Sequence, residues 1–264
     1  AEVRLTNKKQ LDDKFNELFS NRIKMSKNSG HSSFLSYIFQ VKGRFDYSIK
    51  ECDDFARCVE KHVVPLARSI NQKRKQLLKV DFLKPWDLSC DPEGRPALKP
   101  FANSDQLIAA THKIFNRISP ELGKLFESMK NQKLLDLDTR MGKAPGGYQC
   151  GLEESRLPFI FMNSVGTNSD LFTLLHETGH SFHQFFMAIQ NLTAYRDINA
   201  EIAEVASMSM ELIGGDFLSE IYDENTLKRV RKEHLEDVIK LLPWVATIDQ
   251  FQIWMYSNPN HTET

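Results

Sequence analysis

Most of the chain is patterned as amphipathic helices, because apolar residues recur at three- and four-residue spacing along most of its length. This periodicity predicts six helical segments, at residues 8–27, 49–78, 105–130, 169–190, 197–220 and 225–254. We expect proline to break or kink two of them, the second near Pro65 and the last near Pro243. The proline-rich stretch 82–100 is typical of a connecting loop.

A different pattern separates the third and fourth helical segments. Residues 135–139, 147–151 and 158–163 alternate residues that favour extended backbone with turn chemistry, which predicts three short strands. We therefore expect a mainly α fold with a small β-sheet beside the helix at 169–190.

Length and composition indicate one domain, or two closely packed lobes, with a substantial core, since 41% of the 264 residues are hydrophobic. A net charge of −1 gives no basis for nucleic-acid binding. No apolar run approaches the ~20 residues needed to cross a bilayer, so we expect no membrane partner. The four cysteines, at positions 52, 58, 90 and 150, form no C-x-x-C pair, which favours reduced thiols and a cytoplasmic location.

The helix predicted at 169–190 carries the string H-E-T-G-H at residues 176–180. His176 and His180, four residues apart, share one helix face about 5–6 Å apart, so both can offer a nitrogen to one zinc ion. Glu177 lies about 100° around the axis, on the polar side, where it can reach a metal-bound water. Gly179 would let another element or a substrate approach.

The same helix has a broad apolar arc that predicts packing against a core. Its members are Leu171, Leu174, Leu175, Phe182, Phe185, Phe186 and Ile189.

A hydrolytic zinc site needs a third protein ligand and one open position. His183 shares the face of His176 but lies two turns beyond it, about 10.5 Å along the axis, too far to bind the same ion comfortably. The helix at 197–220 carries Glu201, Glu204 and Glu211 within about 80° of one another, as one acidic stripe. Spacing alone does not choose between Glu201 and Glu204.

These residues resemble a known family. The strings H-E-T-G-H-S-F-H at 176–183 and A-E-I-A-E-V-A-S-M-S-M-E-L at 200–212 are similar to oligoendopeptidase F and its relatives in the thimet oligopeptidase family of zinc metallopeptidases. K-G-R-F-D-Y at 42–47, L-D-T-R-M-G-K-A-P-G-G-Y at 137–148 and P-F-I-F-M-N at 158–163 agree with it. The resemblance implies a zincin-like helical fold, and the glutamate of E-V-A-S-M, here Glu204, as the third ligand.

The resemblance implies a zinc-dependent endopeptidase that hydrolyses short oligopeptides, with one zinc ion per chain. Zinc would be held by His176, His180 and Glu204 and would polarise the scissile carbonyl, while Glu177 would act as general base.

Other residues are predicted to surround this centre. Glu201 and Glu211 are candidates to orient the ligand imidazoles. An exposed strand edge near Tyr148, Phe161 and Met162 would hold an extended peptide by backbone hydrogen bonds, although a buried core strand explains these side chains equally well. His183 is either a substrate contact or an ordinary helix residue.

Family members are roughly twice as long, with a further N-terminal helical region and a tyrosine-rich C-terminal element. We therefore expect residues 1–264 to be a central catalytic region, with a helical lobe at 1–130 and a zinc-binding lobe at 131–264, and the oxyanion donor to lie outside them. The alternative is a non-catalytic zinc- or peptide-binding module in which Cys150 or His183 closes a structural site. Glu177 argues against that alternative, because a structural site has no use for a base there.

Overall fold

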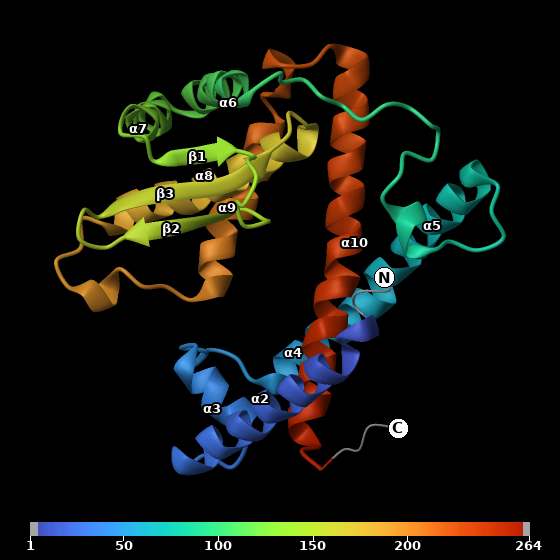
Figure 1. The fold of residues 1–264 in the computed structure, drawn as a ribbon, viewed down its shortest axis with the longest axis vertical. Helices are drawn as coiled ribbons and strands as arrows, with labels where there is room; N and C mark the ends of the chain where they lie inside the picture. Colours follow the sequence, from blue (N-terminus) through green and yellow to red (C-terminus); the bar gives the residue numbers. More distant parts are fainter. Residues whose placement is uncertain (1–4, 261–264) are drawn as a thin grey trace. The chain divides into compact units, whose positions relative to one another are not determined.

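The structure is a computed structural model that describes residues 5–260 (Figure 1). It contains two compact units, Ala1–Ile70 with Asp237–Thr264, and Asn71–Glu236. The boundaries of these units differ from those of the predicted lobes, 1–130 and 131–264, because residues 104–131 pack with the part that contains the sheet. The functional division into a helical lobe and a zinc-binding lobe stays a prediction. The chain ends, on which the expectation of a central region partly rested, lie outside the described residues.

The first unit is helical. It contains α2 (Lys8–Asn28), α3 (Phe34–Val41), α4 (Ile49–Cys58), the π-helical turn η1 (Val59–Val63), the start of α5 (Val64–Leu78) and the end of α10 (Glu224–Ser257). A small core gathers Phe34 and Leu35 of α3 with Met255 and Tyr256 of α10. The sequence analysis missed α3, since eight residues are too few for a helical period to stand out.

The two prolines expected to disturb helices behave differently. Before Pro65 the helix widens into the π turn η1, which accommodates a residue that has no N–H and whose ring crowds the preceding turn. Helix α10 instead continues through Pro243, so a break there is wrong, while a kink stays a prediction.

The second unit combines helices with the sheet. Its elements are α6 (Ser104–Ile118), α7 (Pro120–Asn131), β1 (Leu135–Asp138), β2 (Tyr148–Leu152), β3 (Leu157–Ser164), α8 (Asn168–Met187), α9 (Ala200–Gly215), the start of α10, and the 3₁₀ turns η2 (Pro85–Leu88), η3 (Thr193–Tyr195) and η4 (Leu218–Glu220).

The helix predicted at 105–130 is two helices. Ser119 precedes Pro120 and is extended, with φ −159° and ψ 130°, because a proline disfavours helical backbone in the residue before it. Ser119 also caps α7 through a hydrogen bond from the N–H of Glu121.

The predicted small sheet is confirmed, with strand order β1-β3-β2. Strand β3 pairs in parallel with β1 and antiparallel with β2, so among the described residues β2 is an edge strand. Pro158, Ile160 and Met162 alternate along β3 as its buried side.

Helix α8 packs against β2 and β3 on one side and against α9 on the other, as Figure 1 shows. It begins after Thr167, where the side chain of Asp170 accepts hydrogen bonds from the N–H groups of Val165 and Thr167. Leu171, Leu174, Leu175 and Phe182 are buried, as the apolar arc predicted. Phe186 and Ile189 at its end are exposed, so the arc was drawn too long.

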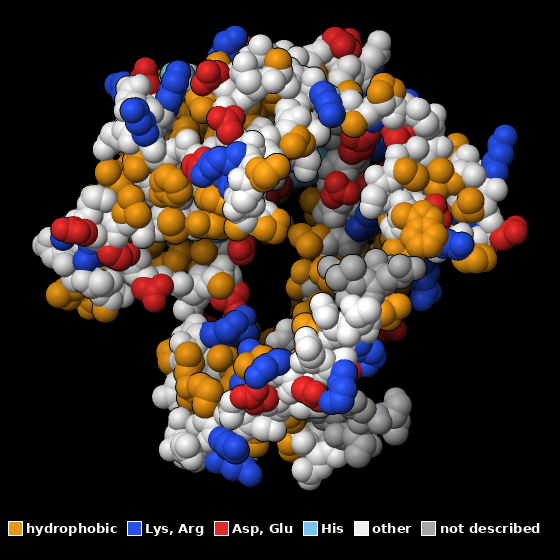
Figure 2. All heavy atoms as spheres, viewed as in Figure 1, with side chains coloured by type: hydrophobic (Ala, Val, Ile, Leu, Met, Phe, Trp, Pro, Cys, Tyr) orange, Lys and Arg blue, Asp and Glu red, His pale blue; other side chains and the backbone are white. Residues whose placement is uncertain are grey.

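On the face shown in Figure 2, positive and negative side chains are interspersed. That distribution accords with the net charge of −1. None of the helices in the described part of the chain is long and apolar enough to span a bilayer. The four cysteines carry free thiols. A cytoplasmic location stays a prediction.

Candidate metal centre

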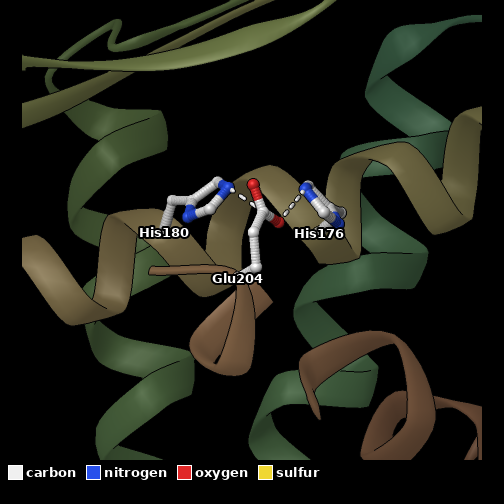
Figure 3. Close-up of side chains that lie close together, drawn as sticks. All are labelled: His176, His180 and Glu204. Carbon is white, nitrogen blue, oxygen red and sulfur yellow. Dashed lines mark ion pairs between the residues drawn. The ribbon is translucent and has the colours of Figure 1, made fainter. Parts of the chain in front are cut away.

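Two adjacent helices bring together three side chains that could hold a metal ion (Figure 3). His176 and His180 stand one turn apart on α8, and Glu204 reaches them from α9. Glu204 Oε2 lies 3.3 Å from His176 Nε2 and 3.8 Å from His180 Nε2. The ligand atoms all lie within 4.8 Å of one another, the one such group found among residues 5–260.

Gly179 sets the distance between the two helices. A Cβ at this position would lie 2.6 Å from the Cα of Ser207 and 2.7 Å from the carbonyl oxygen of Ala206, both backbone atoms of α9. The approach predicted for Gly179 is therefore that of α9. Because Glu204 is less than one turn from Ser207, this contact places the carboxylate opposite the two histidines.

Glu204 is held by its own helix. The buried hydroxyl of Ser207 donates a 2.7 Å hydrogen bond to Glu204 Oε2, one turn along α9. The side chain of Glu204 is otherwise half exposed.

His176 is contacted from behind by Glu211, one of the two residues predicted to orient the ligand imidazoles. His176 Nδ1 lies 2.7 Å from Glu211 Oε1, and Glu211 Oε2 lies 3.2 Å from Nε2 of His234 on α10. Burial alone would raise the pKa of Glu211, but the hydrogen bonds from His176 and His234 outweigh it and lower that pKa to about 2. An ionised carboxylate only accepts, so each imidazole donates to it.

The donor set fits a metal ion. With its proton on Nδ1, neutral His176 presents the lone pair of Nε2 to the carboxylate of Glu204, and two acceptors 3.3 Å apart need a cation or a further proton between them. Zinc takes imidazole and carboxylate ligands at about 2.0–2.2 Å, which sets neighbouring tetrahedral ligands about 3.3–3.6 Å apart.

The two histidines have different electrostatic surroundings. The hydrogen bond to Glu211 raises the pKa of His176. Burial lowers the pKa of His180, although the nearby Glu204 and a hydrogen bond to the backbone carbonyl of Ala203 oppose it.

Glu177 lies beside the group but under the sheet. It is buried, 8% exposed, and not on a solvated polar side as the helical layout suggested, because β2 covers it. Burial raises the pKa of Glu177, while His176 and a hydrogen bond from the backbone N–H of Gln149 work in the opposite direction. A carboxylate with a raised pKa is suited to take up a proton.

A pocket of about 290 Å³ opens next to His180. Its walls come from β2, the second half of α8, and the segment before α9, and they include Gln149, His183, Gln184 and Arg196. His183 therefore lies beside the group without belonging to it.

The other predicted residues are spread around this arrangement. Tyr148 is half exposed and its ring stacks on Phe161 with centroids 5.0 Å apart. Met162 is 2% exposed in the core, where no substrate could reach it, because its side chain is on the buried side of β3. Glu201 and Cys150 lie outside the three-residue group.

Sequence reasoning missed His234 and Ser207. His234 is a single histidine on a long helix, 23 residues after Glu211, and no local pattern marks it. Ser207 did carry a signal, since it follows Glu204 by three residues, the spacing at which helix side chains meet.

Comparison with known proteins agrees with the resemblance. Residues 3–264 match the profile of peptidase family M3. The chain is 26% identical over 168 residues to the chromosomal oligoendopeptidase F of Lactococcus lactis and 28% identical over 170 residues to oligopeptidase PepF of Bacillus subtilis. These alignments cover 61% and 63% of this chain, but only 26% and 24% of those proteins.

A solved structure of PZ peptidase A with an inhibitor superimposes with a TM-score of 0.90 and 30% identity, covering 97% of this chain and 45% of that one. The chain thus spans about a quarter of the curated relatives and less than half of this structural neighbour. Since the family profile covers nearly all of the sequence, the chain belongs to peptidase family M3.

Proposed function

We propose that the protein is a zinc-dependent endopeptidase that cleaves short oligopeptides. His176, His180 and Glu204 would hold one zinc ion per chain, and Glu177 would serve as general base. The observation that carries the proposal is the placement of two histidine nitrogens and a carboxylate oxygen within 4.8 Å of one another, with a buried carboxylate beside them.

The residues divide the work. Zinc, when bound, would supply a Lewis acid for the scissile carbonyl and acidify water there. Glu177 would take a proton from the attacking water and return it to the leaving amine, and the N–H of Gln149 would keep its carboxylate directed.

An extended peptide would have two contacts near the group. The outer edge of β2 offers backbone groups for strand addition, and the pocket beside His180 offers room for a side chain. Tyr148 with Phe161, and His183, are the side chains we propose to contact the peptide. The relatives' names, oligoendopeptidase F and oligopeptidase PepF, support peptides as the substrate class.

The alternative, a structural metal in a non-catalytic module, needs a fourth side-chain ligand. Neither Cys150 nor His183 joins the group within the described residues. In a closed structural site the buried carboxyl group of Glu177 would have no role, and this favours the catalytic hypothesis.

Zinc content in matched variants tests the ligand set. We expect Glu204→Ala to lose zinc under mild chelation while Glu201→Ala retains most of it, since only Glu204 reaches both histidines. Equal loss would show that the carboxylate ligand is misassigned.

X-ray absorption of the zinc-loaded protein tests the open position. The proposal expects three protein ligands and one solvent oxygen. A fourth protein ligand, nitrogen or sulfur, would overturn the catalytic reading and leave the structural one.

A further inference from the structure

We propose that His234 is a positioning residue for the metal centre: it holds Glu211, and Glu211 in turn holds the ring of His176 with Nε2 toward the metal. The inference rests on the proposed metal ligation, and it adds a residue from a third helix, α10, to the two that supply the ligands.

The contacts form one continuous chain. His176 Nδ1 is 2.7 Å from Glu211 Oε1, and His234 Nε2 is 3.2 Å from Glu211 Oε2. Each carboxylate oxygen thus has one imidazole donor. With a single donor, the carboxylate of Glu211 would be free to rotate about its last side-chain bond; the second donor fixes its plane.

The surroundings keep His234 itself in place. Its ring stacks on Phe172 of α8, with centroids 4.3 Å apart and planes 27° apart. The side chain of His234 is 15% exposed and that of Glu211 is 20% exposed, so water competes little for these hydrogen bonds. Phe172 is one turn before His176, so the same helix that carries the ligand also sets the place of His234.

The hydrogen bonds from His234 to Glu211 and from His176 to Glu211 both have the carboxylate as acceptor. Each oxygen of Glu211 faces one imidazole nitrogen, so in the proposed arrangement His176 would donate from Nδ1 and offer Nε2 to the metal. A metal-bound histidine usually donates its other N–H to a carboxylate or carbonyl, and loss of such partners typically lowers metal affinity 10- to 100-fold. His234 acts one contact further out, so we expect an effect near the lower limit.

The experiment compares substitutions that differ only in the donor. His234→Gln keeps an N–H donor near the end of the side chain. His234→Met has nearly the same shape as the glutamine variant but has no donor. His234→Phe keeps the ring that stacks on Phe172 and also lacks the donor. His112→Phe is the matched control, because the ring of His112 stacks on Phe126 in the same unit.

Two readouts apply to the whole chain: the zinc dissociation constant by chelator competition, and the tautomer of His176 in the metal-free protein by long-range ¹H–¹⁵N correlation. We expect His234→Met and His234→Phe to weaken zinc binding about tenfold and to reduce the Nδ1–H tautomer, while His234→Gln and His112→Phe stay within about twofold of wild type.

A role confined to packing predicts another pattern. Equal affinities for the Gln and Met variants would overturn the proposal, as would an effect of His234→Met that persists in full in a Glu211→Ala background. Failure of the wild-type chain to bind zinc would instead remove the proposed function. If His234→Phe does not fold, the Gln and Met pair still decides.

Discussion

The two sides of the metal group are built differently, although the histidines that mark them stand one turn apart on one helix. On the closed side, His176 contacts Glu211, which in turn contacts His234, and all three side chains are largely buried. On the open side, His180 borders a pocket of about 290 Å³ whose walls include a strand edge and an irregular segment before α9.

The difference separates two requirements that the proposed peptidase site would have to meet. Ligand positions need rigid support, and charged hydrogen bonds between helices provide it on the closed side. The proposed substrate would need space next to the metal group, and in the described part of the chain the pocket beside His180 offers it. The predicted roles of Glu211 and His183 fall on opposite sides of this division.

The largest effect is expected where the two sides meet. Glu177→Gln should reduce peptide cleavage about 10²- to 10⁴-fold, because it removes the base but keeps the shape and the acceptor for the Gln149 N–H. Zinc content should not change. Steady-state assay of a fluorogenic peptide with matched zinc loading measures it, with Glu121→Gln on α7 as control.

Cleavage above about one hundredth of wild type would mean that Glu177 is not the base. Loss of zinc in this variant would place it among the ligands, and the division into ligands and base would fail.

The second prediction perturbs the contact between α8 and α9 on which both sides depend. Gly179→Ala should weaken zinc binding roughly tenfold or more and lower the free energy of unfolding by about 1–3 kcal/mol, because its Cβ would meet the backbone of α9 at Ser207 and Ala206. Gly215→Ala is the matched control, since a Cβ there meets nothing within 4 Å. Chelator competition measures the zinc affinity, and urea unfolding measures the free energy of unfolding. Equal results for the two variants would show that the contact between α8 and α9 does not set the ligand geometry.

Local patterns predicted much of this molecule. Helix periodicity placed α8 and α10 within three residues at each end, and alternation with turn residues located all three strands. The H-E-x-x-H spacing put both histidines on one face because that relation lies within a single turn. Pro120 also indicates the break between α6 and α7 at Ser119, although the predicted helix at 105–130 did not include it.

Relations between elements were not predictable in the same way. The choice of Glu204 over Glu201 depends on how α9 is rotated against α8, which the contact at Gly179 sets. Glu177 is buried because β2 crosses over it, and a helical layout contains no information about a strand. His234 comes from another helix altogether. Only the resemblance to relatives, and not spacing, singled out Glu204.

The third prediction perturbs the open side alone. His183→Ala should raise KM about three- to tenfold, the loss of roughly one hydrogen bond, and leave the zinc dissociation constant unchanged, because His183 lines the pocket outside the ligand group. Peptide kinetics and chelator competition on the same preparation measure it. Weaker zinc binding with no change in KM would make His183 a ligand and revive the closed structural site.

The smallest effect is expected in the loop that leads into β2, the strand bordering the open side. Hydrogen bonds from Arg140 and from the buried Lys143 lower the pKa of Asp136 from 3.8 to about 2. Because the folded-state pKa is lower than the unfolded one, the stabilisation is complete above about pH 5 and is lost as pH falls from about 4 to about 2. Asp136→Asn should therefore lower the free energy of unfolding by about 1–2 kcal/mol at neutral pH, allowing for screening of the exposed Arg140, with the difference from wild type roughly halved near pH 3. Asp138→Asn is the control, since Lys143 contacts the backbone carbonyl of Asp138. Urea unfolding at the two pH values measures it, and a difference that stays constant with pH would show that the ionised carboxylate of Asp136 does not anchor this loop.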